Sequence, residues 1–164
     1  MSPRVLVAGI GNVFLGDDGF GSEAARRLAA EPLPEGVTVV DYGIRGMHLA
    51  FDLLDGYDAL VIVDALPHGG APGDVTVLEV GEADLGDGEF DAHGMNPVAV
   101  LASLGTLGGR LPPRTHVVGC EPRDVDEGIG LSPEVAAAVD TALSAIRVLI
   151  SAKPVQQPST AKGV

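Results

Sequence analysis

Residues 5–21, V-L-V-A-G-I-G-N-V-F-L-G-D-D-G-F-G, carry the strongest structural signal in the chain. The apolar run at 5–8 predicts a buried strand, and the glycines that follow predict a turn. Ala24, Ala25, Leu28 and Ala29 then recur at helical spacing. Strand, turn and helix together predict the first half of a βαβ unit. Open α/β sheets bind their ligands at such turns.

The turn does not match a nucleotide-binding motif. Gly9 and Gly11 begin a G-x-G, but Phe14 stands where the dinucleotide fingerprint needs its third glycine. Asp17 and Asp18 would compete with a phosphate for the N–H groups at the start of the helix. We therefore predict that the turn presents a carboxylate to a cation. The alternative is that one of the two aspartates caps the helix.

The net charge limits the classes of partner. The chain of 164 residues has 23 acidic and 10 basic residues, which gives −13 at pH 7. This charge disfavours nucleic acid and anionic membrane surfaces, and it favours cations or basic peptide segments. No apolar run reaches the length of a membrane span, and the first is too short for a signal peptide. A cytoplasmic location is the expectation.

Strand and helix patterns alternate along the chain. Apolar runs predict further strands at 37–40, 59–63 and 116–120. The β-branched run at 59–63 predicts the central strand, whereas alternation at 74–80 predicts an antiparallel edge strand. The expected fold is one three-layer α/β/α domain over residues 1–150, with a mostly parallel sheet. Residues 151–164 are polar and are predicted to be a disordered tail.

Two later helices carry start signals. Asn96 followed by Pro97 predicts the beginning of a helix at 98–107, and Ser132 followed by Pro133 predicts the beginning of the last helix. Another helix is predicted at 47–54. Its residues expected to be buried are Leu49, Phe51, Leu53 and Leu54.

Two more aspartates lie at the ends of predicted strands. Asp64 ends the central strand, where a carboxylate is costly to bury unless it is paired or bound to a metal. Asp41 follows the strand at 37–40, and it either bonds its own turn or belongs to a site. Cys120 is expected to be a small buried residue, because nothing in the sequence supplies a base for it.

Motifs along residues 4–150 resemble, in the same order, those of the hydrogenase maturation peptidases. These nickel-dependent endopeptidases trim the C-terminal extension of a [NiFe]-hydrogenase large subunit. The matching features are the opening at 5–21, Asp41-x-Gly43-x-x-Gly46, Val63-Asp64-Ala65, His93 ahead of an apolar helix, and Gly128-x-Gly130-Leu131-Ser132-Pro133-x-Val135.

Asp18, Asp64 and His93 come from three separate strand-to-helix junctions that could share one edge of the sheet. Two carboxylates and a neutral imidazole carry a charge of −2, which balances one divalent ion. Three protein ligands leave positions open for water or substrate. Oxygen and nitrogen ligands suit nickel, zinc, manganese or iron, and do not separate nickel from zinc. His68, four residues after Asp64, is the substitute for His93.

The resemblance implies that the ion is nickel already inserted in the precursor of the large subunit, with Asp18, Asp64 and His93 as ligands and catalytic residues. The family often has Glu where this chain has Asp18, which is shorter by about 1.5 Å. The ligands would therefore have to lie closer together, or Asp17 would share the role of metal ligand with Asp18. Family classification implies an aspartic-type endopeptidase, and the expected chemistry is metal-assisted hydrolysis. Asp41 is expected to contact the substrate and is the first candidate for the general base, ahead of Glu121.

Two alternatives stay open. A nickel-sensing or scaffold protein would bind the precursor without cutting it. A nucleotide-binding domain would use Gly9–Gly21 and would be indifferent to Asp18, Asp64 and His93.

Overall fold

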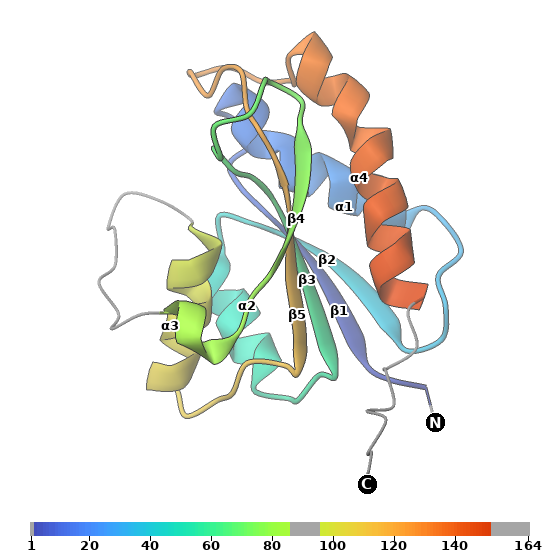
Figure 1. Ribbon diagram of the computed structural model, residues 1–164, viewed down its shortest axis with the longest axis vertical. Coiled ribbons are helices and arrows are strands. Elements are labelled where there is room, and N and C mark those ends of the chain that lie inside the picture. Colours follow the sequence, from blue (N-terminus) through green and yellow to red (C-terminus); the bar gives the residue numbers. More distant parts are fainter. Residues whose placement is uncertain (1, 86–95, 152–164) are drawn as a thin grey trace, which may run out of the picture.

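The computed structural model describes residues 2–85 and 96–151 of the chain. Its centre is a five-stranded sheet (Figure 1). In spatial order the strands are β2 (Val37–Gly43), β1 (Val5–Ile10), β3 (Ala59–Ala65), β5 (Arg114–Cys120) and β4 (Val75–Glu79). The first four are parallel, and β4 pairs antiparallel with β5 at the edge. The predictions of a central 59–63 strand and an antiparallel edge strand are confirmed.

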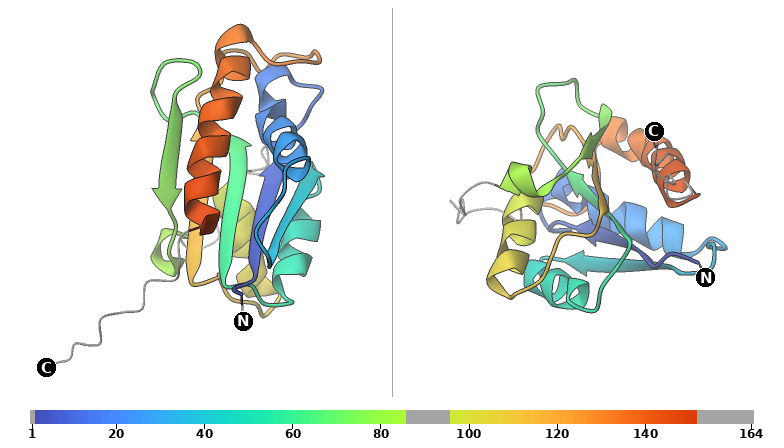
Figure 2. Two further views of the ribbon diagram at one scale, coloured as in Figure 1. Left: turned by 90° about the vertical axis from the view of Figure 1, so that its right-hand side faces the viewer. Right: turned by 60° about the horizontal axis from the view of Figure 1, so that its bottom comes forward.

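Helices cover both faces of the sheet, which makes three layers (Figure 2). On one face, Val5 and Val7 of β1 pack with α1 (Phe20–Ala29) and α4 (Pro133–Ser151). On the other, Leu6 and Ala8 pack with α2 (Gly46–Leu53) and α3 (Pro97–Thr106). Successive side chains of a strand point to opposite faces. A continuously apolar strand therefore supplies both cores, and the predicted α/β/α sandwich is confirmed.

The helix α1 begins after a short 3₁₀ helix, η1 (Gly16–Gly19), and a second one, η2 (Glu82–Leu85), follows β4. Gly19 is the N-cap residue of α1 and makes no side-chain capping bond. The alternative that Asp17 or Asp18 caps this helix is therefore wrong. A Cβ on Gly21 would lie 2.2 Å from the carbonyl oxygen of Val63. Glycine at this position lets the start of α1 lie directly against the sheet.

The predicted helix starts agree with the structure. The side chain of Asn96 accepts a hydrogen bond of 2.9 Å from the N–H of Val98, and Pro97 is the first residue of α3. Ser132 directly precedes α4, and its carbonyl oxygen accepts the N–H of Ala136. Its hydroxyl, however, donates a hydrogen bond to Asp17.

Two expectations need correction. Leu49 and Leu53 of α2 are buried, but Phe51 and the adjoining Leu54 are exposed by 51% and 44%. A helix turns about 100° per residue, so residues 49 and 53 share a face that 51 and 54 do not. The predicted tail began at residue 151, yet Ser151 is the last residue of α4; residues 152–164 lie outside the described part. Within residues 2–85 and 96–151, no helix combines the length and apolar character needed to cross a bilayer.

Candidate active site

The candidate residues gather at the carboxyl edge of the sheet. Because β1, β2 and β3 are parallel neighbours, their ends meet at this edge. Gly9 of β1 pairs with Asp41 on one side and with Val63, next to Asp64, on the other. The loop from β1 to η1 therefore emerges between the two aspartates. This is the edge at which α/β proteins place their ligands.

Asp64 is the penultimate residue of strand β3 and is buried there, rather than lying in a loop after the strand. It belongs to β3, is 4% exposed, and by strand alternation lies on the same face as Leu60 and Ile62. Burial raises the pKa of its carboxyl group well above the ordinary value, the nearby Asp18 carboxylate raises it further, and the N–H of Ala65 acts in the opposite direction. A charged Asp64 is therefore unfavourable here unless a cation offsets it.

Asp18 is the second carboxylate of the site. It lies in η1 and is half-buried, and its Oδ2 accepts a hydrogen bond of 2.8 Å from the N–H of Asn12. Gly11 packs between Asp18 and Asp64. A Cβ on Gly11 would lie 2.0 Å from the Asp18 carbonyl oxygen and 3.7 Å from Oδ1 of Asp64, so the position has no room for a side chain. Gly11 also has a φ of 137°, which favours glycine. The backbone at Gly11 thus lies against both aspartates.

Asp17 has a different role from its neighbour. Its side chain is fully buried and accepts four hydrogen bonds, all from a segment more than 100 residues away: from the N–H of Ser132 (2.6 Å), the hydroxyl of Ser132 (2.8 Å), and the N–H groups of Arg123 (2.9 Å) and Asp124 (3.0 Å). Burial raises the pKa of this carboxyl group, but the four donors outweigh that effect and the pKa lies below its ordinary value. Asp17 is therefore committed to bonds within the protein, and Asp18 is the carboxylate of this loop that acts on Asp64. Nothing in the Asp-Asp sequence signalled this division.

Asp41 forms the turn bond that its sequence context suggested, and it also contacts α1. Its Oδ1 accepts hydrogen bonds from the hydroxyl of Ser22 (2.7 Å) and from the N–H of Gly43 (3.0 Å). The carbonyl oxygen of Gly43 accepts the N–H of Gly11 at 2.9 Å. The Asp41 turn is thereby tied to the same loop that contacts Asp18 and Asp64.

The other candidates behave differently. Oε1 of Glu121 accepts hydrogen bonds from the N–H groups of His68 (2.8 Å) and Gly70 (2.9 Å), and these donors, His68 foremost, lower the pKa of the Glu121 carboxyl group. The ring of His68 lies near Oε1 of Glu121 and the carbonyl oxygen of Asp74. His68 and Glu121 are thus engaged with each other.

His93 lies outside the described residues. Among the described residues, no group of three or more His, Cys, Asp and Glu side chains could hold a metal ion.

Sequence and structure comparisons agree on one family. Residues 23–148 match the sequence model described as hydrogenase maturation protease. The chain belongs to the hydrogenase maturation protease family. The hydrogenase expression/formation protein HupD of Rhizobium leguminosarum is 31% identical to it, over 93% of this chain and 80% of HupD. The family assignment makes the protein an endopeptidase of hydrogenase maturation and favours this function over nucleotide binding.

Solved structures of maturation proteases share the fold. The hydrogenase maturating endopeptidase HybD from E. coli superimposes with a TM-score of 0.74 at 30% identity, over 90% of this chain and 91% of HybD. The maturation protease HybD from Thermococcus kodakarensis gives a TM-score of 0.70 at 32% identity, over 90% of this chain and 99% of that protein. The family resemblance drawn from the motifs is confirmed.

Proposed function

We propose that this protease removes the C-terminal extension of a [NiFe]-hydrogenase large-subunit precursor and depends on nickel that the precursor already carries. Asp18, Asp64 and His93 bind that nickel when the precursor docks. The observation that supports this most directly is the electrostatic coupling of Asp18 to the almost completely buried Asp64. Two neighbouring carboxylates in such a place favour a bound divalent cation.

The raised pKa of Asp64 supports an ion that arrives with the substrate. Without a cation, the Asp64 carboxyl group tends to hold a proton. A divalent ion displaces this proton, since metal binding requires the ionised carboxylate. With the His93 imidazole, the charge of the ligands balances one divalent ion. Nickel binds nitrogen and oxygen ligands more strongly than manganese or iron does, and zinc is the second candidate.

The proposed chemistry is metal-assisted hydrolysis. The nickel of the substrate polarises the scissile carbonyl group or activates a water molecule. Asp41 contacts the substrate beside this centre and is the preferred general base, because its turn is bonded to the Gly11 loop. Glu121 is less suitable, since the N–H groups of His68 and Gly70 lower the pKa of its carboxyl group and make it a weaker base.

Cleavage of the precursor tests this proposal. Purified protein would be mixed with large-subunit precursor prepared with or without nickel, and the precursor mass would be followed by mass spectrometry. Nickel-dependent loss of a C-terminal peptide is expected for the wild-type protein, and no cleavage for Asp64→Asn and His93→Ala. Asp140→Asn, which changes an exposed carboxylate of α4, serves as the control and should cleave normally. Binding without any change in mass would instead support the scaffold alternative.

A further inference from the structure

Two loops next to the candidate site expose large apolar side chains. Val13 and Phe14, which precede η1, are exposed by 42% and 62%, and Val125 and Ile129, which precede α4, by 48% and 80%. Water-exposed apolar side chains that gather in one place mark interaction surfaces more often than isolated ones do.

The two loops are bonded to each other. Leu15 and Gly128 form a parallel bridge. The N–H of Gly16 donates to the carbonyl oxygen of Gly128, and the N–H of Gly128 donates to the carbonyl oxygen of Phe14, each at 2.8 Å. The buried carboxylate of Asp17 ties the same segments together a few residues on. Their apolar side chains are therefore presented from a fixed backbone, which lowers the entropy lost on binding.

A cleft of about 310 Å³ lies between the loops and the start of α1. Its lining includes Val13, Ile129 and Leu131, together with the glycines Gly16, Gly19 and Gly130. Gly130 has nothing within 4 Å of where a Cβ would lie, so another chain can approach its backbone closely, whereas Gly16 and Gly19 already lie against Asp124 and Val13. We name this feature the Val13–Ile129 cleft.

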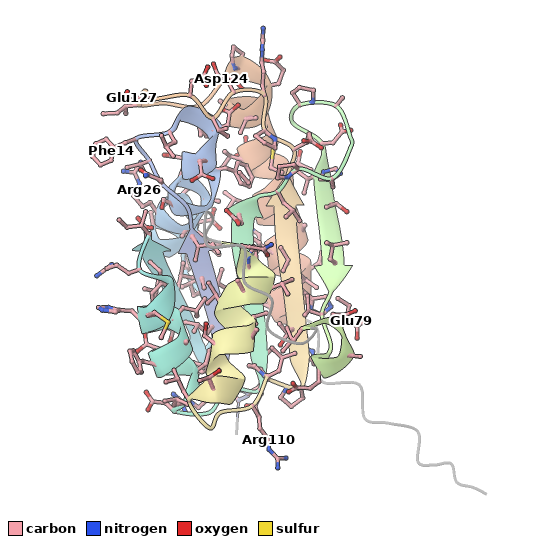
Figure 3. All side chains as sticks on the ribbon, turned by 90° about the vertical axis from the view of Figure 1, so that its left-hand side faces the viewer. Phe14, Arg26, Glu79, Arg110, Asp124 and Glu127 are labelled. Atoms are coloured by element: carbon pink, nitrogen blue, oxygen red, sulfur yellow. The ribbon has the colours of Figure 1, made fainter. Side chains whose placement is uncertain are left out.

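Acidic side chains that form no ion pair with any other described residue border the cleft. Arg26 and Glu23, which both line the cleft, form an ion pair, and Arg123 bonds Glu134, so both of these arginines already have carboxylate partners. Asp124, Asp126 and Glu127 are exposed on the loop that carries Ile129. Figure 3 shows Phe14, Arg26, Asp124 and Glu127 at the same end of the molecule, away from Arg110. An occupant of matching chemistry has an apolar side chain next to lysine or arginine.

We infer that the Val13–Ile129 cleft docks the large-subunit precursor, through a segment of the precursor in which an apolar side chain lies beside basic residues. This inference rests on the proposed function. Gly16 and Gly19, which line the cleft, are the two ends of η1, and Asp18 lies between them. A segment held in the cleft therefore lies against the short helix that carries Asp18. A second copy of this chain is a poorer occupant, because each copy carries a net charge of −13.

Binding measurements with matched variants test the inference. Nickel-loaded precursor would be immobilised, and its affinity measured by biolayer interferometry for the wild type, Ile129→Ser, the double variant Asp126→Asn/Glu127→Gln, and Val148→Ser. Val148 is also a β-branched aliphatic residue, 68% exposed on α4 near its other end, and is the matched control. Circular dichroism and urea denaturation would verify that each variant is folded. Cleavage kinetics would be measured in parallel.

Ile129→Ser is expected to raise the Kd and the KM for the precursor about tenfold, the loss that follows from exposing one large aliphatic side chain. Its kcat at saturating precursor should be unchanged. The double variant should weaken binding at low salt, with a smaller effect at high salt. Val148→Ser should bind like the wild type.

An unchanged Kd for Ile129→Ser would overturn the inference, and so would a wild-type protein that does not bind the precursor. A dimer in light scattering that Ile129→Ser dissociates without any loss of precursor binding would assign the cleft to a second copy. If Ile129→Ser loses binding but the wild type never changes the precursor mass, docking stands and the proposed cleavage fails. If the wild type cleaves the precursor in a nickel-dependent manner and Ile129→Ser leaves the KM unchanged, the proposed cleavage stands and the docking inference fails.

Discussion

The hydroxyl of Ser132 donates a hydrogen bond of 2.8 Å to Oδ2 of Asp17, across 115 residues of sequence. The N–H of Ser132 donates to the other oxygen of the same carboxylate at 2.6 Å. Asp17 thereby joins the start of α4 to the loop that carries Asp18. The loop that carries Asp18 is therefore held by the segment before α4 as well as by its own hydrogen bonds.

Asp17→Asn is expected to lower the free energy of unfolding by about 3 kcal/mol, because the amide offers fewer acceptor sites to four buried donors and removes the charge that strengthens their bonds. Urea denaturation measures this loss. Asp140→Asn, which removes an exposed ion pair with Arg27, should cost less than about 1 kcal/mol. Equal losses in the two variants would contradict the buried role of Asp17.

The lowered pKa of Asp17 predicts a pH dependence of stability. Its unfolded value is near 3.8, and the folded value is lower. Asp17 therefore contributes stability that is present above the unfolded pKa and is lost as the pH falls through the folded pKa. The difference in unfolding free energy between the wild type and Asp17→Asn should shrink as the pH is lowered below about 4. A difference that is constant with pH would show that the charge contributes nothing.

Asp64 predicts the opposite dependence. Its pKa is raised in the folded protein, so the folded state binds more protons than the unfolded state does above pH 3.8. The contribution of Asp64 to the free energy of unfolding is fully present below the unfolded pKa and is lost as the pH rises through the folded pKa. Asp64→Asn cannot ionise, and it should gain stability relative to the wild type as the pH rises. Urea denaturation across this range checks the sign, and a parallel pH profile for the two proteins would argue against a charge-destabilised Asp64.

Asp41→Asn separates charge from structure in the Asp41 turn. An asparagine Oδ1 can keep both acceptor bonds, to Ser22 and to Gly43. We expect the stability to change by less than about 1 kcal/mol, whereas cleavage of the nickel-loaded precursor becomes slower. Ser22→Ala is the reverse control, because it removes one bond and keeps the charge. If Ser22→Ala slows cleavage more than Asp41→Asn does, the role of Asp41 is to hold its turn.

Cys120 is expected to be dispensable for cleavage. Its side chain is fully buried, and burial, followed by the nearby Asp17, raises the pKa of the thiol to about 11. Thiolate is the reactive form, so a disulfide reagent at pH 8 should label Cys120 only after unfolding. Cys120→Ala should retain the cleavage rate of the wild type. Loss of cleavage in a folded Cys120→Ala protein would reopen a thiol mechanism.

Much of the fold could be predicted because its elements are encoded locally. The apolar runs at 5–8 and 59–63 identified the inner strands β1 and β3, and the alternation at 74–80 identified the edge strand β4. Asn96 and Pro97 marked the start of α3. Phe51 and Leu54 were predicted incorrectly, since their hydrophobicity indicates burial, but the angle around α2 turns them outward.

The sequence by itself determined the layered α/β fold, the family and the set of acidic residues near the strand ends, because these depend on the order of residues along the chain. The roles of Asp17 and Asp18 were decided only by the tertiary structure. Side chains of adjacent residues in a 3₁₀ helix point about 120° apart. Asp17 therefore meets the donors of residues 123–132, whereas Asp18 lies close enough to Asp64 to raise its pKa. Those donors are distant in sequence, and only folding brings them to one of two otherwise identical side chains.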